Sequence, residues 1–138
     1  MKIFFSTLSF GERTNTYKIG KNTVTEVFDD KNALIKRIEY DEFNRDVDSK
    51  WFGSTGKLSE HLHKEYYKKA DEEGVVETFK NKTQEYVRKS YTRFENGLKH
   101  VFDDFQSKTG KNYINDFVYD KLGNLVKIIN NGKVIYTK

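Results

Sequence analysis

A long pattern of apolar residues in the middle of the chain constrains the fold more than any other feature. Between residues 76 and 105, apolar or small side chains recur at steps of three and four, and the chain contains no proline. The residues of this pattern are Val76, Phe79, Thr83, Tyr86, Val87, Ser90, Tyr91, Phe94, Leu98, Val101, Phe102 and Phe105. On an α-helix they would lie within an arc of about 160°, opposite a mostly polar face. The pattern predicts a long amphipathic helix.

A second apolar repeat precedes this predicted helix. Leu58, Leu62, Tyr66 and Ala70 follow one another every four residues, which is typical of a helix that begins after a Ser or Thr cap. Gly74 suits the position just after the end of a helix. The apolar face nevertheless keeps nearly the same phase across Gly74. The sequence therefore predicts two helices or one long helix over residues 56–107.

Both ends of the chain have the alternating pattern of β-strands. We expect four antiparallel strands within residues 2–40, the first in residues 2–10, because apolar and polar residues alternate between turn-forming segments. Residues 113–137 predict a three-strand meander. Its last two strands are joined by Asn131-Gly132, a dipeptide that tolerates the positive φ angles of a type I′ turn.

Together these elements predict an α+β fold in a single domain of residues 1–138. The antiparallel sheet would consist of the N-terminal strands and the C-terminal meander, and would pack against the helical segment. Aromatic residues make up 15% of the chain, so ring side chains are expected to fill much of the core. The absence of cysteine excludes disulfides, thiolate metal sites and thiol nucleophiles.

A short motif recurs at three turns. Phe28-Asp29 is followed by Asn32 and Leu34, Tyr40-Asp41 by Asn44, and Tyr119-Asp120 by Gly123 and Leu125. This motif resembles the strand-turn-strand unit of YD-type (rearrangement-hotspot) repeats. It covers only these turns, and its second copy lacks the leucine. We interpret it as the chemistry of turns that begin with Asp, and we assign no family from it.

The chain has a net charge of +4 and a pI of about 9.1, which allows a nucleic acid or an acidic protein as the partner. On the predicted helix, Lys82, Lys89, Arg93 and His100 would form a basic stripe along one flank. Such a stripe could follow a phosphate backbone. Acidic residues lie on both sides of it, however, so a solvated helix face of mixed charge is the favoured interpretation.

The three histidines are the candidates for catalysis or metal binding. His61 and His63 would point away from each other on a helix, whereas on a strand they would share a face. His61 with Glu65, and His100 with Asp104, have the i, i+4 spacing of helical metal ligands. We interpret these pairs as solvated polar residues and predict neither a metal nor a cofactor. An alternative is a ribonuclease-like site of His61, His63 and His100.

The length of the predicted helix suggests a contact with another molecule. About 30 helical residues would extend for about 45 Å, whereas strands of five or six residues span about 17–20 Å. One end of the helix is therefore expected to project from the sheet and to meet a partner or a second copy of the chain.

From these features we predict a cofactor-free, cytoplasmic binding protein, and a binding role is favoured over an enzymatic one. It would inhibit or neutralise a macromolecular partner, as immunity proteins, antitoxins and phage-type inhibitors do. The expected partner is a protein, with a homodimer as a further option and no membrane association. Tyr and Arg make good interface anchors, and the predicted contact residues are Tyr66, Tyr67, Lys82, Arg88, Lys89 and Arg93. The alternative is a nucleic-acid-binding protein or a metal-independent ribonuclease toxin.

Overall fold

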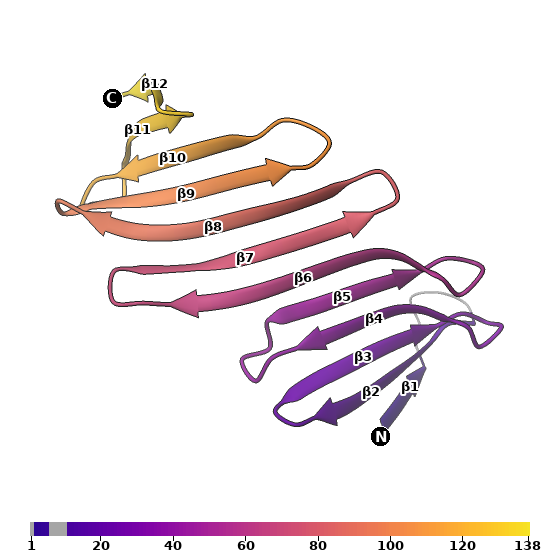
Figure 1. Ribbon diagram of the computed structural model, residues 1–138. Coiled ribbons are helices and arrows are strands. Elements are labelled where there is room, and N and C mark those ends of the chain that lie inside the picture. Colours follow the sequence, from indigo (N-terminus) through magenta and orange to yellow (C-terminus); the bar gives the residue numbers. More distant parts are fainter. Residues whose placement is uncertain (1, 6–10) are drawn as a thin grey trace. The chain divides into compact units, whose positions relative to one another are not determined.

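The protein is an antiparallel β-sheet protein (Figure 1). The computed structural model describes the backbone of residues 2–5 and all of residues 11–138, and it contains no helix in these residues. The strands are β1 (Lys2–Phe5), β2 (Arg13–Ile19), β3 (Asn22–Phe28), β4 (Leu34–Tyr40), β5 (Asp46–Phe52), β6 (Leu58–Lys68), β7 (Glu72–Asn81), β8 (Glu85–Glu95), β9 (Leu98–Ser107), β10 (Tyr113–Tyr119), β11 (Leu125–Asn130) and β12 (Lys133–Thr137). Strands that pair with each other are neighbours in the sequence.

The α+β prediction is therefore wrong for the middle of the chain. The segment 56–107, predicted as helix, consists of β6, β7, β8 and β9. The long amphipathic helix does not exist, and neither does the projecting helix end from which an outside contact was inferred. Gly74, predicted to terminate a helix, lies inside β7. No helix in the described part of the chain is long and apolar enough to cross a membrane.

The strand predictions for the two ends are confirmed. β2, β3 and β4 lie within the predicted N-terminal region, and β10, β11 and β12 form the predicted meander. β1 confirms a strand in residues 2–5, while residues 6–10 of that prediction lie outside the described residues. Asn131 and Gly132 have φ angles of 48° and 80°, as the predicted hairpin turn requires.

The turns marked by the recurring motif share one structure. In the turn after β3, the Asp29 carboxylate accepts hydrogen bonds from the backbone N–H groups of Lys31 and Ala33, each at 2.9 Å. Asn32 has a φ of 66° and donates its N–H to the Asp29 carbonyl. Asp41 and Asp120 accept the corresponding hydrogen bonds in their own turns. The interpretation of the motif as turn chemistry is confirmed.

A fourth turn of this type was not recognised from the sequence. Gly53 follows the aromatic residue Phe52. Its N–H donates to the carbonyl of Lys57, and its carbonyl accepts from the N–H of Gly56, as the backbone of Asp29 does with Ala33 and Asn32. Gly56 takes the positive φ angle, 79°. Gly53 has no carboxylate, so the backbone alone closes this turn. The turns after β3, β4 and β5 are each preceded by an aromatic residue, and these residues lie at intervals of twelve: Phe28, Tyr40 and Phe52. Twelve residues is the length of one strand and its turn in this half of the chain.

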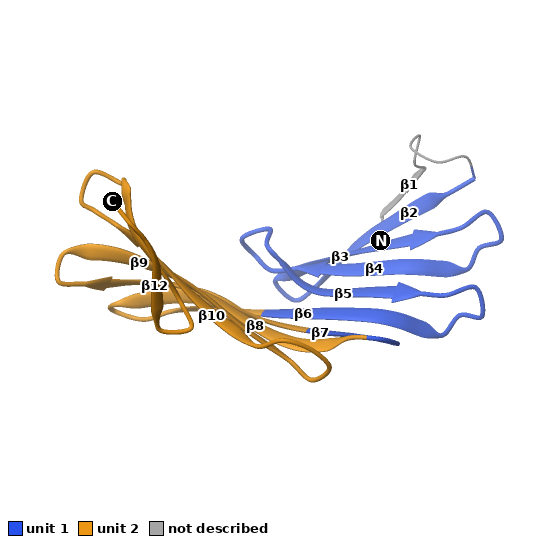
Figure 2. Cartoon of the chain, turned by 90° about the horizontal axis from the view of Figure 1, so that it is seen from above, with its two compact units in different colours: residues 1–64, 79–83 blue, residues 65–78, 84–138 orange. Residues whose placement is uncertain are grey.

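The chain divides into two compact units (Figure 2). Unit 1 comprises residues 1–64 and 79–83, and unit 2 comprises residues 65–78 and 84–138. In unit 1, β1 to β6 pair antiparallel with their sequence neighbours. In unit 2, β8 to β12 pair in the same way. The expected single domain stays a prediction.

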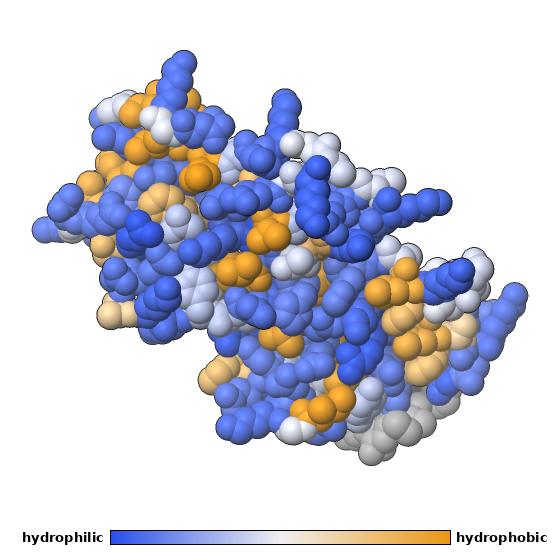
Figure 3. Space-filling model, in the orientation of Figure 1, coloured by the Kyte–Doolittle hydropathy of each residue, from blue (hydrophilic) through white to orange (hydrophobic). Residues whose placement is uncertain are grey.

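Few apolar side chains are fully buried. Among the described residues these are Val24 in unit 1, with 0% exposure, and Val118 in unit 2, with 2%. Figure 3 shows apolar residues in separate small patches among hydrophilic ones. Most strand residues are half-buried, so cross-strand pairs must supply much of the side-chain contact. The aromatic rings do not fill a buried core as expected. They stack on one another across the sheet, as Tyr91 does on Phe102 with 4.6 Å between the ring centroids.

Gly74 provides a test of the strand arrangement in unit 2. A Cβ atom at Gly74 would collide with the carbonyl oxygen of Ser90 and would lie 2.6 Å from the Cβ of Tyr91. Because the Ser90 obstacle is backbone, Gly74→Ala should lower the free energy of unfolding by about 1–3 kcal/mol, as overpacking does. Urea denaturation measures this change. Gly53→Ala is the matched control, since the nearest atom to its added Cβ lies at 3.9 Å. Equal losses of stability in the two variants would contradict the close approach.

Candidate functional site

Three of the six predicted contact residues gather around one carboxylate in unit 2. Glu72, the first residue of β7, accepts a hydrogen bond of 2.6 Å from the Tyr67 hydroxyl through Oε2. Its Oε1 accepts from Nε and Nη2 of Arg93, at 3.1 and 2.8 Å. Nζ of Lys89 lies 3.4 Å from Oε2. The Glu72 side chain is only 9% exposed, so this Glu72 cluster is a compact, partly buried charge network.

The other three predicted contact residues lie elsewhere. Tyr66 and Arg88 are the sequence neighbours of Tyr67 and Lys89 on β6 and β8, so their side chains project from the opposite face of the strand. Arg88 donates two hydrogen bonds to the Asp103 carboxylate, at 2.8 and 2.7 Å. Lys82 lies in the turn after β7 and belongs to unit 1. The six residues therefore do not form one surface.

Aromatic rings stack against the cations of the Glu72 cluster. The Nζ atom of Lys89 lies 4.5 Å from the centroid of the Tyr91 ring, and the guanidinium carbon of Arg93 lies 5.6 Å from it. Arg93 also lies 5.4 Å from the centroid of the Phe102 ring, which stacks on Tyr91. These distances are within the range of cation–π attraction. The cluster thus holds the Arg93 and Tyr91 side chains in one geometry.

The charges in the cluster shift the pKa values of its members. Hydrogen bonds from Tyr67 and then Arg93, with the nearby charge of Lys89, lower the pKa of Glu72 to about 2. Burial and then the hydrogen bond to Glu72 raise the pKa of Tyr67. The hydrogen bonds to Glu72 and then Glu95 raise the pKa of Arg93. Glu72 is therefore the anion that holds the surrounding donors in place.

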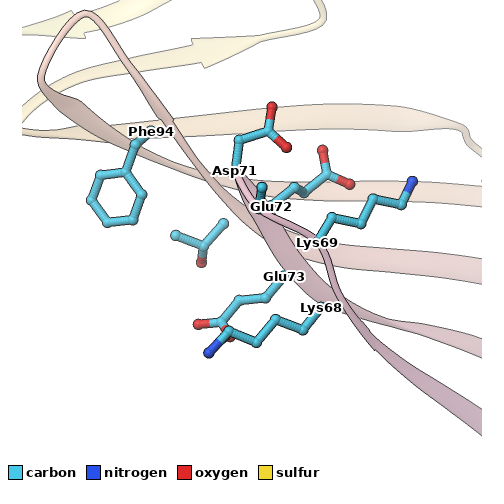
Figure 4. Close-up of a pocket in the computed structure, with 8 residues that line it drawn as sticks. Lys68, Lys69, Asp71, Glu72, Glu73 and Phe94 are labelled. Atoms are coloured by element: carbon cyan, nitrogen blue, oxygen red, sulfur yellow. The ribbon is translucent and has the colours of Figure 1, made fainter.

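A surface hollow adjoins the cluster (Figure 4). It has a volume of about 230 Å³ and is lined by the turn between β6 and β7 together with Thr92 and Phe94 of β8. Phe94 stands on one side of the hollow, facing the charged side chains of the turn (Figure 4). The Phe94 side chain is 64% exposed. Phe94 is the sequence neighbour of Arg93 on β8, so its ring lies on the opposite face of the strand, and Glu72 is the member of the cluster that also lines the hollow. An exposed aromatic ring beside charged side chains is the kind of surface that binds proteins.

The predicted basic stripe takes a different form on strands. Arg93 on β8 lies directly opposite His100 on β9, and Lys89 lies on the same face of β8 because it is four residues from Arg93. Arg93 is paired with Glu72 and Glu95, at 2.8 and 3.0 Å. The cations on this face of unit 2 are thus largely neutralised by carboxylates of their own unit.

The histidines form two separate groups. In unit 1, His61 and His63 on β6 both contact Oδ1 of Asp48 on β5, at 2.7 and 3.0 Å. In unit 2, Nδ1 of His100 lies 3.0 and 2.9 Å from the two carboxylate oxygens of Asp116. The i, i+4 partners considered on a helix, Glu65 and Asp104, are not the partners seen in these contacts. Burial raises the pKa of Asp48, but the hydrogen bonds with His61 and His63 outweigh this effect and lower it.

The acidic residues of these sites were missed from the sequence. Glu72, Asp48 and Asp116 each meet their partners across neighbouring strands or a hairpin, so no fixed spacing in the sequence identifies them. The alternation of His61 and His63 was the one usable signal, because two residues at i and i+2 share a face only on a strand. Among the described residues, Asp48, His61 and His63 are the group of side chains that could hold a metal ion.

Comparisons with known proteins give no further guide to these sites. The chain matches no protein-family model, no curated protein and no solved structure.

The low pKa of Glu72 predicts a pH-dependent stability. Its pKa is about 2 in the folded chain against an ordinary value of 4.5, so the unfolded chain binds more protons between these values. The stabilisation by Glu72 is then complete above about pH 4.5 and is lost as the pH falls towards 2. We expect Glu72→Gln to lower the melting temperature at pH 6 and to lower it much less at pH 2. Thermal unfolding followed by circular dichroism over this pH range measures the difference.

The neighbouring Glu73→Gln is the matched control for Glu72→Gln. Glu73 is mostly exposed and pairs with Lys68 at 4.0 Å, so its replacement should change the melting temperature little at any pH. If the two variants have the same pH profile, Glu72 does not anchor the cluster.

Proposed function

We propose that this protein is a binding protein that inhibits or neutralises a macromolecular partner, and that the partner is a protein. The observation that carries the proposal is the position of Phe94, a largely exposed ring beside a hollow that is lined by the charged turn between β6 and β7, with Glu72 among the lining residues. The predicted cytoplasmic location belongs to the same proposal. The projecting helix, which first suggested a partner, no longer supports it.

The physical reason lies in the cost of ordering an interface. Long side chains such as Arg and Lys lose rotamer freedom on binding, at about 0.5–1.5 kcal/mol for each immobilised side chain. In this cluster Arg93 and Lys89 are already restrained by the partly buried carboxylate of Glu72 and by the ring of Tyr91. Phe94 lies on the opposite face of β8 from Arg93 and Lys89, so a partner that packs on Phe94 would meet this preorganised cluster at Glu72, which lines the same hollow. The charged residues of the turn, such as Lys68 and Glu73, would form its polar rim.

The same pairing weakens the alternative of nucleic-acid binding at this surface. A phosphate would have to compete with Glu72 and Glu95 for Arg93, and the nearby carboxylates would repel it. The ribonuclease alternative, with His61, His63 and His100, divides its residues between the two units. Both alternatives are kept as outcomes of the binding experiment.

Replacing Phe94 tests the proposed surface. We expect Phe94→Ala to weaken binding of the protein partner about 30-fold, corresponding to about 2 kcal/mol for an interface hot spot. The partner is first isolated by cross-linking and affinity capture from an extract of the source organism at physiological salt. It is then produced in pure form, and its affinity for the wild-type chain and the variant is measured by calorimetry. Its own activity is measured with and without the chain, and inhibition is the expected result.

Phe43→Ala provides the matched control for this experiment. Phe43 is also a largely exposed phenylalanine, at 70%, and it lies in unit 1. Its replacement should leave the affinity unchanged. Equal affinity of the wild type and Phe94→Ala would refute the proposed surface. Capture of RNA or DNA alone, with affinity that falls steeply as salt is raised, would instead favour the nucleic-acid alternative.

A further inference from the structure

Two histidines and an aspartate converge on one face of the sheet in unit 1. His61 and His63 are two residues apart on β6, so their side chains project from the same face. Asp48 on β5 is paired directly with His63, and Lys50 with His61. The alternation of β6 and the register of β5 therefore bring all three side chains together. Figure 1 shows β5 and β6 as antiparallel neighbours.

The three donor atoms are spaced as ligands around one ion. Nε2 of His61 and Nδ1 of His63 lie 2.7 and 3.0 Å from the same oxygen, Oδ1 of Asp48, and each of the three residues offers a ligand atom within 4.8 Å of the others. Metal–ligand bonds of about 2.1 Å place two donors about 3.0 Å apart at a right angle and about 3.4 Å apart at a tetrahedral angle. Both N–O distances are already close to these values, and the two imidazole nitrogens, which lie within 4.8 Å of each other, would have to approach each other by at most about 1.4 Å to reach the tetrahedral separation.

The surroundings of these residues suit an ion that enters from solvent. The Asp48 side chain is 16% exposed, whereas those of His61 and His63 are 36% and 44% exposed. Oδ2 of Asp48 faces Nζ of Lys50 at 4.0 Å, so the carboxylate would bind through Oδ1 alone. His61 also borders a hollow of about 480 Å³. Three protein ligands would thus leave coordination positions for water or another ligand.

From this geometry we propose that Asp48, His61 and His63 form a binding site for a divalent transition-metal ion, with Zn²⁺ as the reference ion. Two imidazoles and one carboxylate favour Zn²⁺, Co²⁺, Fe²⁺ or Ni²⁺ over Mg²⁺ and Ca²⁺, which prefer oxygen ligands only. In the absence of an ion, hydrogen bonds between the histidines and Asp48 hold the same side chains together. To bind the ion, each neutral imidazole would present a lone pair from the nitrogen that now contacts Asp48 and would carry its single proton on the other ring nitrogen.

This proposal departs from the expectation of a protein without a metal. That expectation depended on a helix, on which His61 and His63 would point in different directions. On β6 they face the same carboxylate. The proposal uses only residues of unit 1 and does not depend on the proposed protein partner, which would bind unit 2.

Metal titration of the purified, untagged chain tests the site. Calorimetry with Zn²⁺ should show one ion bound per chain. His61→Gln, His63→Gln and Asp48→Asn should each weaken binding by more than the roughly 10–100-fold that loss of a second-shell group costs. His100→Gln is the matched control. His100 also contacts an aspartate, Asp116, but no second histidine shares that contact. Its affinity should equal that of the wild type.

A second measurement on the wild type avoids variants that fail to fold. The chain has only three histidines, so nitrogen NMR can follow each imidazole during the titration. The ring signals of His61 and His63 should shift together on addition of Zn²⁺, while those of His100 stay unchanged. The proposal is overturned if no saturable binding occurs at millimolar Zn²⁺, if the three variants bind as the wild type does, or if His100 is the imidazole that responds.

Discussion

Antiparallel pairing between strands that are neighbours in the sequence is the interaction on which the rest of this structure depends. Full burial of apolar side chains contributes little, since among the described residues only Val24 and Val118 are fully buried apolar residues. Backbone hydrogen bonds and side-chain pairs across adjacent strands must therefore supply most of the stabilisation. The repeated turns make this pairing reliable. In three of them an Asp side chain satisfies two backbone N–H groups, and a residue with positive φ reverses the chain.

The same pairing explains why the candidate sites are half-buried polar clusters. On a sheet, a side chain meets the residue opposite it and those two positions away on its own strand. A carboxylate at such a position can collect several donors, as Glu72 does with Tyr67, Lys89 and Arg93. Asp48 does so with two histidines. These networks pair the charges that partial burial would otherwise make unfavourable, so they stabilise the sheet.

The sequence predicts the two ends of the fold correctly because alternation and turn residues agree there. It fails between residues 56 and 107 because strands with apolar residues on both faces also place such residues three and four apart. The decisive local signal in that region is Asn96-Gly97, the same dipeptide that correctly predicts the hairpin at Asn131-Gly132. Asn96 and Gly97 have φ angles of 53° and 77° and join β8 to β9. The abundance of Val, Thr, Tyr and Phe in β7 and β8 also favours strands over a helix.

Which residues a sequence places together depends on whether the side chains are assumed to repeat as on a helix or as on a strand. Two histidines at i and i+2 diverge on a helix and converge on a strand, so the wrong period concealed the group formed by His61, His63 and Asp48. The error also supplied a spurious reason for a partner, since a helix longer than its sheet implied an uncovered end. The proposed partner is now supported by side-chain contacts between neighbouring strands. A sheet with half-buried side chains leaves rings such as Phe94 exposed. On the other face of β8, the partly buried Glu72 restrains Tyr67 and Arg93. The proposed binding of a partner therefore depends on side chains ordered across neighbouring strands and requires no projecting element.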